Sequence, residues 1–222
     1  DLLKEKGYTL EIKEFDDYPQ QNVVVDEGEF DANYFQHQPY LDNFNEEKGS
    51  DLVSAAKIHY EPLGIYPGAS EDLENIKDGA KIAVPNDATN EARALLLLEE
   101  NGIITLKEDA GLNATKKDVE ENPHNIEIVE LDAAQIARVV EELDFVVLNG
   151  NYALDAGFNV QTDAIAKEEA DSEAAQTYAN IIAVKKENKD SEKIKALVEV
   201  LQSEEIGKFI TDTYEGAVVP MK

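Results

Sequence analysis

The sequence contains no cysteine, no tryptophan and a single methionine among its 222 residues. Without cysteine the chain can form neither a disulfide nor a thiolate metal site, and it has no thiol nucleophile. Long hydrophobic runs are missing too. The longest, residues 94–98, is far shorter than the roughly 20 residues that a helix needs to cross a bilayer. The sequence is therefore not that of a disulfide-stapled or thiol-dependent protein.

Basic residues are scarce. The chain has 48 acidic residues against 20 lysines and arginines, which gives a formal charge of −28. Arg93 and Arg138 are its arginines. A surface this acidic repels phosphate backbones and anionic lipid head groups, so no binding to nucleic acid is expected. Most of the acids are expected to be solvated helix faces, while 42% hydrophobic residues suffice for a globular chain.

The usual signatures of catalysis and metal binding are also missing. The sequence has no G-x-S-x-G, no P-loop, no H-E-x-x-H and no G-x-G-x-x-G. Its three histidines, His37, His59 and His124, do not have the spacing of metal ligands. With 48 acids, no pair of carboxylates stands out as catalytic. The sequence thus predicts no catalytic residue, no metal site and no cofactor.

Short apolar stretches alternate with helical patterns along the chain, which predicts an α/β fold with mainly parallel sheets. Strands are expected at residues 9–15, 30–35, 52–66, 81–85, 126–131, 145–148 and 179–184. Helices are expected at residues 20–26, 38–48, 70–76, 91–101, 133–142 and 191–213. In such folds ligands gather at the carboxyl ends of strands, where helix N-termini point.

The first candidate site runs from Val84 to Arg93, where a strand leads through a polar turn into a helix. Thr89 is expected to be the N-cap residue of this helix. The first turn would then offer N–H groups and a partial positive charge to an anion. Arg93 can bind a carboxylate with two parallel hydrogen bonds. The alternative is an ordinary ion pair with one of the many acids.

The second candidate site combines rings and amides. Residues 34–40 hold four aromatic or imidazole rings in a chain with only 7% aromatic residues. Rings attract thioethers by roughly 0.3–1.5 kcal/mol per contact, although core packing would also explain them. Asn149 follows the strand 145–148 and Asn180 lies in the strand 179–184. These amides could receive the amine and carboxylate of an amino acid, or be a turn residue and a structural amide.

Several segments together resemble a known family. Residues 34–42, 84–90 with 93–98, 121–123, 148–153 and 216–218 are similar, in order over nearly the whole chain, to the methionine-binding lipoproteins of the NlpA/MetQ type. This resemblance implies a two-lobed periplasmic-binding-protein fold of type 2, with a ligand cleft between the lobes. The lobes are expected at residues 1–80 plus 182–222, without the N-terminal part of that lobe, and at residues 81–181.

The resemblance also implies a function. The chain would be an extracytoplasmic substrate-binding protein that captures methionine for an ABC importer. Its partners would be methionine, or a related amino acid, and the permease of the transporter. A lipid on an N-terminal cysteine outside this sequence would anchor it to the cell membrane. The matching ligand-binding positions are the rings Tyr18, Phe35, His37 and Tyr40 for the side chain, and Arg93, Asn149 and Asn180 for the carboxylate and amine.

Other functions stay open at this point. The same fold could bind D-methionine, a dipeptide that contains methionine, or another apolar amino acid. A surface antigen or adhesin with a vestigial pocket is an alternative of another class, although the intact set of Arg93, Asn149 and Asn180 argues against it. An enzyme would need activity without any of the motifs named above.

Overall fold

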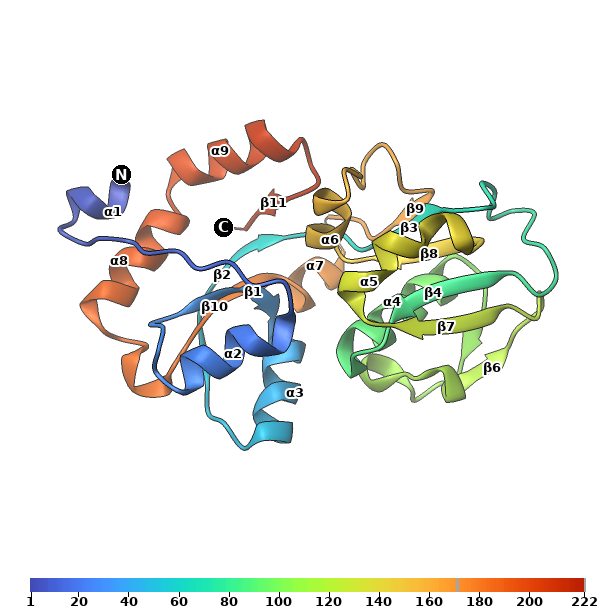
Figure 1. The fold of residues 1–222 in the computed structure, drawn as a ribbon, viewed down its shortest axis with the longest axis horizontal. Helices are drawn as coiled ribbons and strands as arrows, with labels where there is room; N and C mark the ends of the chain where they lie inside the picture. Colours follow the sequence, from blue (N-terminus) through green and yellow to red (C-terminus); the bar gives the residue numbers. More distant parts are fainter. Residues whose placement is uncertain (171, 222) are drawn as a thin grey trace. The chain divides into compact units, whose positions relative to one another are not determined.

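The computed structural model describes residues 1–170 and 172–221. The chain folds into two compact units, one made of Asp1–Glu61 with Ala170–Lys222 and one made of Pro62–Glu169 (Figure 1). Each unit has its own central β-sheet. In the described part of the chain, no helix is both long enough and apolar enough to cross a membrane.

The units begin and end at other residues than the sequence suggested, which were 1–80 with 182–222 and 81–181. Residues 62–80 group with the second unit because β3 (Gly64–Pro67) pairs with β8 (Phe145–Leu148). Residues 170–181 group with the first unit because β10 (Asn180–Val184) lies between two strands of its sheet. The boundaries between the two units depend on which strands pair with each other, and the hydrophobic pattern of a sequence does not show which strands pair.

The sheet of the first unit is antiparallel throughout. Its strand order is β1-β10-β2-β11, with β1 at Asn33–His37, β2 at Val53–Tyr60 and β11 at Val219–Pro220. Every neighbouring pair in it is antiparallel. The expectation of mainly parallel sheets is therefore wrong for this unit. Alternating strands and helices suggested crossovers, but β10 comes from the far end of the chain and separates β1 from β2.

Helices cover both faces of this sheet (Figure 1). Successive residues of a strand point to opposite faces, so Ile181 and Ala183 of β10 pack with α2 and α3, whereas Ile182 and Val184 pack with α8. The apolar sequence of β10 follows from this double burial. The helices of the unit are α1 (Leu2–Glu5), α2 (Tyr18–Asp26), α3 (Gln38–Lys48), α7 (Glu173–Thr177), η4 (Lys186–Asn188), α8 (Glu192–Leu201) and α9 (Glu204–Tyr214).

The sheet of the second unit has the order β7-β4-β8-β3-β9 and is mixed. β7, β4 and β8 are parallel, and β3 and β9 are antiparallel to their neighbours. The further elements of the second unit are β4 (Lys81–Pro85), α4 (Ala88–Glu100), β5 (Thr105–Leu106), η1 (Gly111–Asn113), η2 (Lys116–Asp118), β6 (Val119–Glu121), β7 (Glu127–Leu131), α5 (Ala133–Ile136), η3 (Ala137–Glu142), α6 (Gly150–Asp155) and β9 (Ala166–Lys167). Because β4 and β8 are parallel neighbours, the residues that follow them lie at one edge of the sheet.

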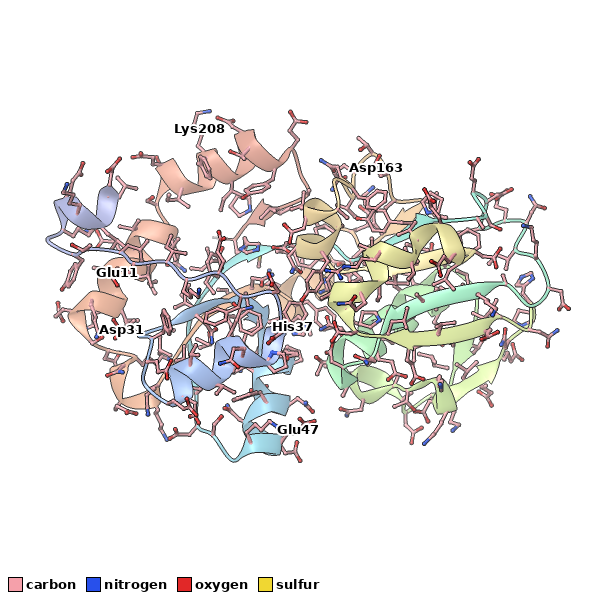
Figure 2. The ribbon with its side chains drawn as sticks, viewed as in Figure 1. Glu11, Asp31, His37, Glu47, Asp163 and Lys208 are labelled. Carbon is pink, nitrogen blue, oxygen red and sulfur yellow. The ribbon has the colours of Figure 1, made fainter. Side chains whose placement is uncertain are left out.

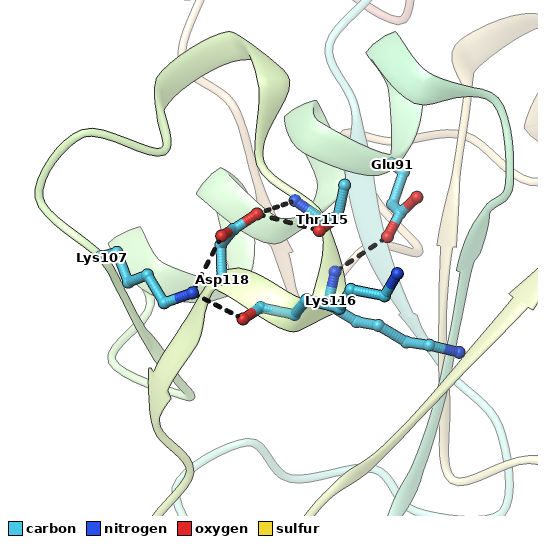
Figure 3. Close-up of polar contacts among 6 residues, drawn as sticks. Glu91, Lys107, Thr115, Lys116 and Asp118 are labelled. Carbon is cyan, nitrogen blue, oxygen red and sulfur yellow. Dashed lines mark hydrogen bonds and ion pairs between the residues drawn. The ribbon is translucent and has the colours of Figure 1, made fainter.

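The loop before β6 is fastened to the start of α4 (Figure 3). The backbone N–H of Lys116 donates to Glu91 Oε1 at 3.0 Å. Asp118 accepts from the N–H and the hydroxyl of Thr115 at 3.0 and 2.9 Å, and from Lys107 Nζ at 3.1 Å. Burial raises the pKa of Glu91, and the bond from Lys116 acts against this rise. Asp118 thus fixes the shape of the loop, and the bond to Glu91 joins this loop to α4.

Two expected elements are absent from the described residues. Residues 9–15 form no strand, and Leu10 and Ile12 are 55% and 77% exposed. Their alternation is typical of a strand, but a strand needs a hydrogen-bonded neighbour, and no described strand pairs with this segment. Residues 70–76 form a turn instead of a helix, because Asp72 accepts from the backbone N–H of Glu74 at 2.8 Å and from Asn75 Nδ2 at 2.6 Å.

A carboxylate joins three parts of the second unit at the start of β8. Asp144 Oδ1 accepts from the hydroxyl of Ser70 at 2.7 Å, and its Oδ2 accepts from the backbone N–H of Lys81 at 2.9 Å. Gly68 lies in the same corner, where an added Cβ would come within 2.2 Å of the carbonyl oxygen of Leu143. A side chain at position 68 would therefore force the backbone apart.

The acid stability of this corner can be tested at Asp144. The Lys81 N–H, and after it the Ser70 hydroxyl, hold the pKa of Asp144 below its usual value. A carboxyl with a lowered pKa adds stability above its unfolded-state pKa of about 3.9, and this stability is lost as the pH falls through the lower folded-state pKa. We expect Asp144→Asn to reduce the free energy of unfolding at pH 7, and the difference from wild type to narrow below a pH of about 4.

Urea unfolding over this pH range measures the effect, with Asp155→Asn as the control because Asp155 is an exposed aspartate on α6. The control should follow wild type at every pH. If the difference in the free energy of unfolding between Asp144→Asn and wild type stayed constant as the pH falls, the prediction would be contradicted.

Candidate functional site

Three half-buried rings form a cluster on the first unit. Tyr18 lies 5.6 Å from Phe35 and 5.7 Å from Tyr40 between ring centroids, and Phe35 lies 5.9 Å from Tyr40. Two of these pairs meet edge to face, a favoured arrangement of aromatic rings. All three rings stay partly accessible. The sequence predicted these rings as site residues, and the structure brings them together.

Local sequence signals place the rings. The side chain of Asp17 caps α2 by accepting from the backbone N–H of Gln20 at 2.9 Å, so that Tyr18 begins the helix. His37 ends β1 and caps α3, because its Nδ1 accepts from the backbone N–H of Tyr40 at 3.2 Å. Proline follows the cap in both helices, as is common in a first turn. Figure 2 shows His37 at the junction of β1 and α3.

A buried triangle of amides fixes α2 against β1. Asn22 Nδ2 donates to Gln36 Oε1 at 2.9 Å, and Gln36 Nε2 donates back to Asn22 Oδ1 at 2.6 Å. Asn33 Nδ2 donates to Asn22 Oδ1 at 2.9 Å, and Asn33 Oδ1 accepts from Gln36 Nε2 at 2.9 Å. Exposure of the three residues is at most 9%. Because Gln36 stands between Phe35 and His37 on β1, the triangle holds α2, which begins with Tyr18, against the strand that carries these two rings.

Tyr178 is a ring that the sequence did not single out. Its ring lies 5.1 Å from that of His37, and it is 4% exposed. Asn180, two residues later, begins β10 and pairs in register with His37 on β1 and with His59 on β2. The predicted site residues of the first unit, Asn180 included, are thus neighbours in one region of its sheet.

His59 belongs to a chain of hydrogen bonds on the same unit. Its Nε2 contacts Glu61 Oε1 at 2.7 Å, and its Nδ1 contacts the hydroxyl of Tyr34. Burial raises the pKa of Tyr34, so its hydroxyl stays protonated at neutral pH. A protonated phenol is a poor nucleophile, and the arrangement ties β1 to β2.

On the second unit, Asp87 begins the helix that carries Arg93. Its side chain accepts from the backbone N–H of Asn90 at 3.0 Å, so Asp87 is the N-cap residue and α4 starts at Ala88. The expectation that Thr89 caps the helix is wrong. Thr89 lies in the first turn and donates its hydroxyl to Asp87 Oδ1 at 3.2 Å. Both residue types favour caps, and the structure uses the earlier one.

Arg93 forms a buried, bidentate ion pair with Glu168. Arg93 Nε donates to Glu168 Oε1 at 2.8 Å, and Nη2 donates to Oε2 at 2.5 Å. Both side chains are 5% exposed. Glu168 Oε2 also accepts from the backbone N–H of Leu63 at 2.9 Å. The pair therefore fixes the plane of the guanidinium group. Through Glu168 it also joins α4 to Leu63, so that the two ends of the unit Pro62–Glu169 are held beside this helix.

Asn149 lies at the same sheet edge as the start of α4, because it follows β8 as Asp87 follows β4. It is 7% exposed, and its Nδ2 donates to Asn90 Oδ1 at 2.8 Å. Asn90 and Arg93 are three residues apart and thus share a face of α4. Asn149, which is predicted from the sequence, is therefore hydrogen-bonded to the face of α4 that also carries Arg93.

Three side chains at these sites were missed, namely Tyr178, Asn90 and Glu168. Asn90 lies inside the recognised turn, but nothing in the sequence marks it as a partner of Asn149. Glu168 is one of 48 acidic residues and carries no distinguishing pattern. Among residues 1–170 and 172–221, no group of three or more histidine, aspartate or glutamate side chains is placed to hold a metal ion.

Comparison with known proteins gives consistent matches over the whole chain. The family model described as NlpA lipoprotein matches residues 1–222. The Methionine-binding lipoprotein MetQ of Bacillus subtilis is 44% identical over 224 residues, which cover 99% of this chain and 81% of that protein. A crystal structure from Ruminococcus gnavus is 65% identical with a TM-score of 0.98, covering 100% of this chain and 91% of that one. A nutrient binding protein from Burkholderia cenocepacia bound to methionine is 44% identical with a TM-score of 0.93, covering 100% and 91%.

Proposed function

The chain belongs to the NlpA lipoprotein family, and we propose that it is an extracytoplasmic substrate-binding protein that captures methionine for an ABC importer. It acts by binding and carries out no chemical step. The ligand is free methionine, the partner is the permease of the importer, and the membrane is reached through a lipid anchor outside this sequence. The relatives support this assignment through their descriptions as methionine-binding and as lipoproteins.

The observation that carries methionine as the ligand is the cluster of Tyr18, Phe35 and Tyr40. These rings are fixed by edge-to-face contacts and by the amide triangle, yet they remain partly accessible. A polarizable thioether gains roughly 0.3–1.5 kcal/mol from each ring that it contacts. We assign the methionine side chain to these three rings and to His37.

The polar groups of the ligand are assigned to Arg93, Asn149 and Asn180. A guanidinium carries five N–H donors, and the bond lengths above place two of them on Glu168. We assign the ligand carboxylate to Arg93, because its fork of donors matches two oxygens. We assign to the two asparagines the hydrogen bonds to the ligand ammonium group and one further hydrogen bond to the ligand carboxylate.

Calorimetric titration tests this function. Protein that has been unfolded, dialysed and refolded to remove any bound ligand is titrated with L-methionine, D-methionine, a methionine dipeptide and norleucine. We expect one L-methionine per chain. Norleucine has a methylene in place of sulfur, so it should bind about twofold to tenfold more weakly for each ring that the sulfur touches. Norleucine binding as tightly as methionine would overturn the thioether assignment. Absence of binding to every ligand would overturn the function and favour an adhesin or antigen.

A further inference from the structure

The side-chain amide of Asn149 is buried and hydrogen-bonded on one side only. Its Nδ2 donates to Asn90 Oδ1 at 2.8 Å. Its Oδ1 is buried as well, but accepts no hydrogen bond from any group in the described part of the chain. Nearly all buried polar atoms in folded proteins have a partner. The carbonyl oxygen of Asn149 therefore points to a donor that the described chain does not supply.

Asp87 determines which end of this amide is presented. Asp87 Oδ1 accepts from the backbone N–H of Asn90, from Asn90 Nδ2 and from the hydroxyl of Thr89, at 3.0, 2.9 and 3.2 Å. A carboxylate only accepts, so Asn90 turns its NH2 group to Asp87 and its carbonyl to Asn149. Asn149 must then turn its NH2 group to Asn90, which leaves its oxygen on the other side. Hydrogen-bond direction thus passes from Asp87 through Asn90 to Asn149.

We propose that Asp87 and Asn90 are positioning residues that present the carbonyl oxygen of Asn149 to the ammonium group of an amino-acid ligand. The inference rests on the proposed function, which supplies that ammonium group. An ammonium group has three N–H donors and no acceptor, so it fits an oxygen and is repelled by an NH2 group. Arg93 lies on the same face of α4 as Asn90, which suits a ligand whose ammonium and carboxylate share one carbon. The ligand class is then a free α-amino acid, and carboxylic acids that lack the α-amino group bind weakly.

The test compares two ligands in variants of Asn90. Calorimetry measures the dissociation constants of L-methionine and of 4-(methylthio)butanoate, which lacks only the amine. We expect wild type to prefer methionine by about a hundredfold or more. In Asn90→Leu, the amide of Asn149 loses its fixed direction, so methionine should bind about tenfold or more weakly while the des-amino acid changes by less than about threefold. The preference therefore shrinks.

Thr89→Val is the matched control, because Thr89 also donates to Asp87 from the first turn of α4, whereas the hydrogen bond to Asn149 comes from Asn90. It should keep the preference for methionine within about twofold of wild type. Equal weakening of both ligands in Asn90→Leu would show a merely structural role and overturn the inference. Wild type that binds neither ligand would overturn the proposed function instead, so the two failures are distinguishable.

A second measurement is independent of whether Asn90→Leu folds. A crystal structure of the wild-type protein with methionine shows which ligand atom meets Asn149. The ligand nitrogen within hydrogen-bond distance of Asn149 Oδ1 supports the inference. A ligand carboxylate oxygen at the Asn149 side chain, or a water molecule alone at Oδ1, overturns it.

Discussion

Arg93→Ala is expected to abolish methionine binding and to destabilise the second unit at the same time. The guanidinium is the group to which the ligand carboxylate is assigned, so its removal takes away the main anchor of the ligand. It also leaves Glu168 buried, 5% exposed, with its arginine partner removed. Breaking a buried ion pair from one side costs about 3–5 kcal/mol. The sequence alone suggests a variant that loses binding and stays folded, and the ion pair adds this cost in stability.

A double variant separates the two effects. Arg93→Met with Glu168→Gln removes both buried charges and keeps similar side-chain volumes, so much of the lost stability should return. Methionine binding should stay absent, because the carboxylate still lacks its partner. Urea unfolding gives the stability of each variant, and calorimetry gives the affinity. Methionine binding that survives in the double variant would remove Arg93 from the site.

Phe35→Ala is the second change for which we expect a large effect. Phe35 contacts both Tyr18 and Tyr40, at 5.6 and 5.9 Å between centroids. Removing an apolar ring that covers a ligand side chain loses about 1.5–3 kcal/mol of burial, which corresponds to roughly a tenfold to hundredfold weaker affinity. Because the ring is only half-buried in the chain itself, the stability of the protein should change much less than its affinity.

Phe15→Ala provides the matched control for this prediction. Phe15 is also half-buried and also pairs with a ring, that of Phe30 at 6.0 Å, but it lies outside the proposed ligand-binding set. Calorimetry should find its affinity for methionine unchanged. Phe35→Leu keeps an apolar side chain but removes one ring, so the preference for methionine over norleucine should fall by the contribution of that ring, about twofold to tenfold. Equal loss of affinity in Phe35→Ala and Phe15→Ala would contradict a specific role of the cluster.

Much of the local structure could be predicted from the sequence, because local signals decide it. The helix expected at residues 38–48 is α3, since Pro39 favours its first turn and Gly49 ends it in the left-handed conformation at φ 69°. The apolar runs at residues 81–85 and 145–148 are β4 and β8. The α/β fold and the family were likewise within reach of the sequence.

Features that depend on distant partners could not be predicted in this way. A hydrophobic pattern does not give strand direction, so β10 between β1 and β2 was not foreseen. Leu10 and Ile12 alternate as a strand would, but no described strand pairs with them. Glu168 lies 75 residues from Arg93, and its role follows only from their contact. The amide direction of Asn149 equally depends on Asn90, which comes 59 residues earlier.

Competition among free amino acids tests the central claim most directly. Refolded, ligand-free protein is incubated with an equimolar mixture of the standard amino acids, passed through a desalting column and measured by native mass spectrometry. Our account predicts one dominant complex that is heavier than the bare chain by one methionine. A spectrum with the bare chain alone, or with a different amino acid bound, would contradict it.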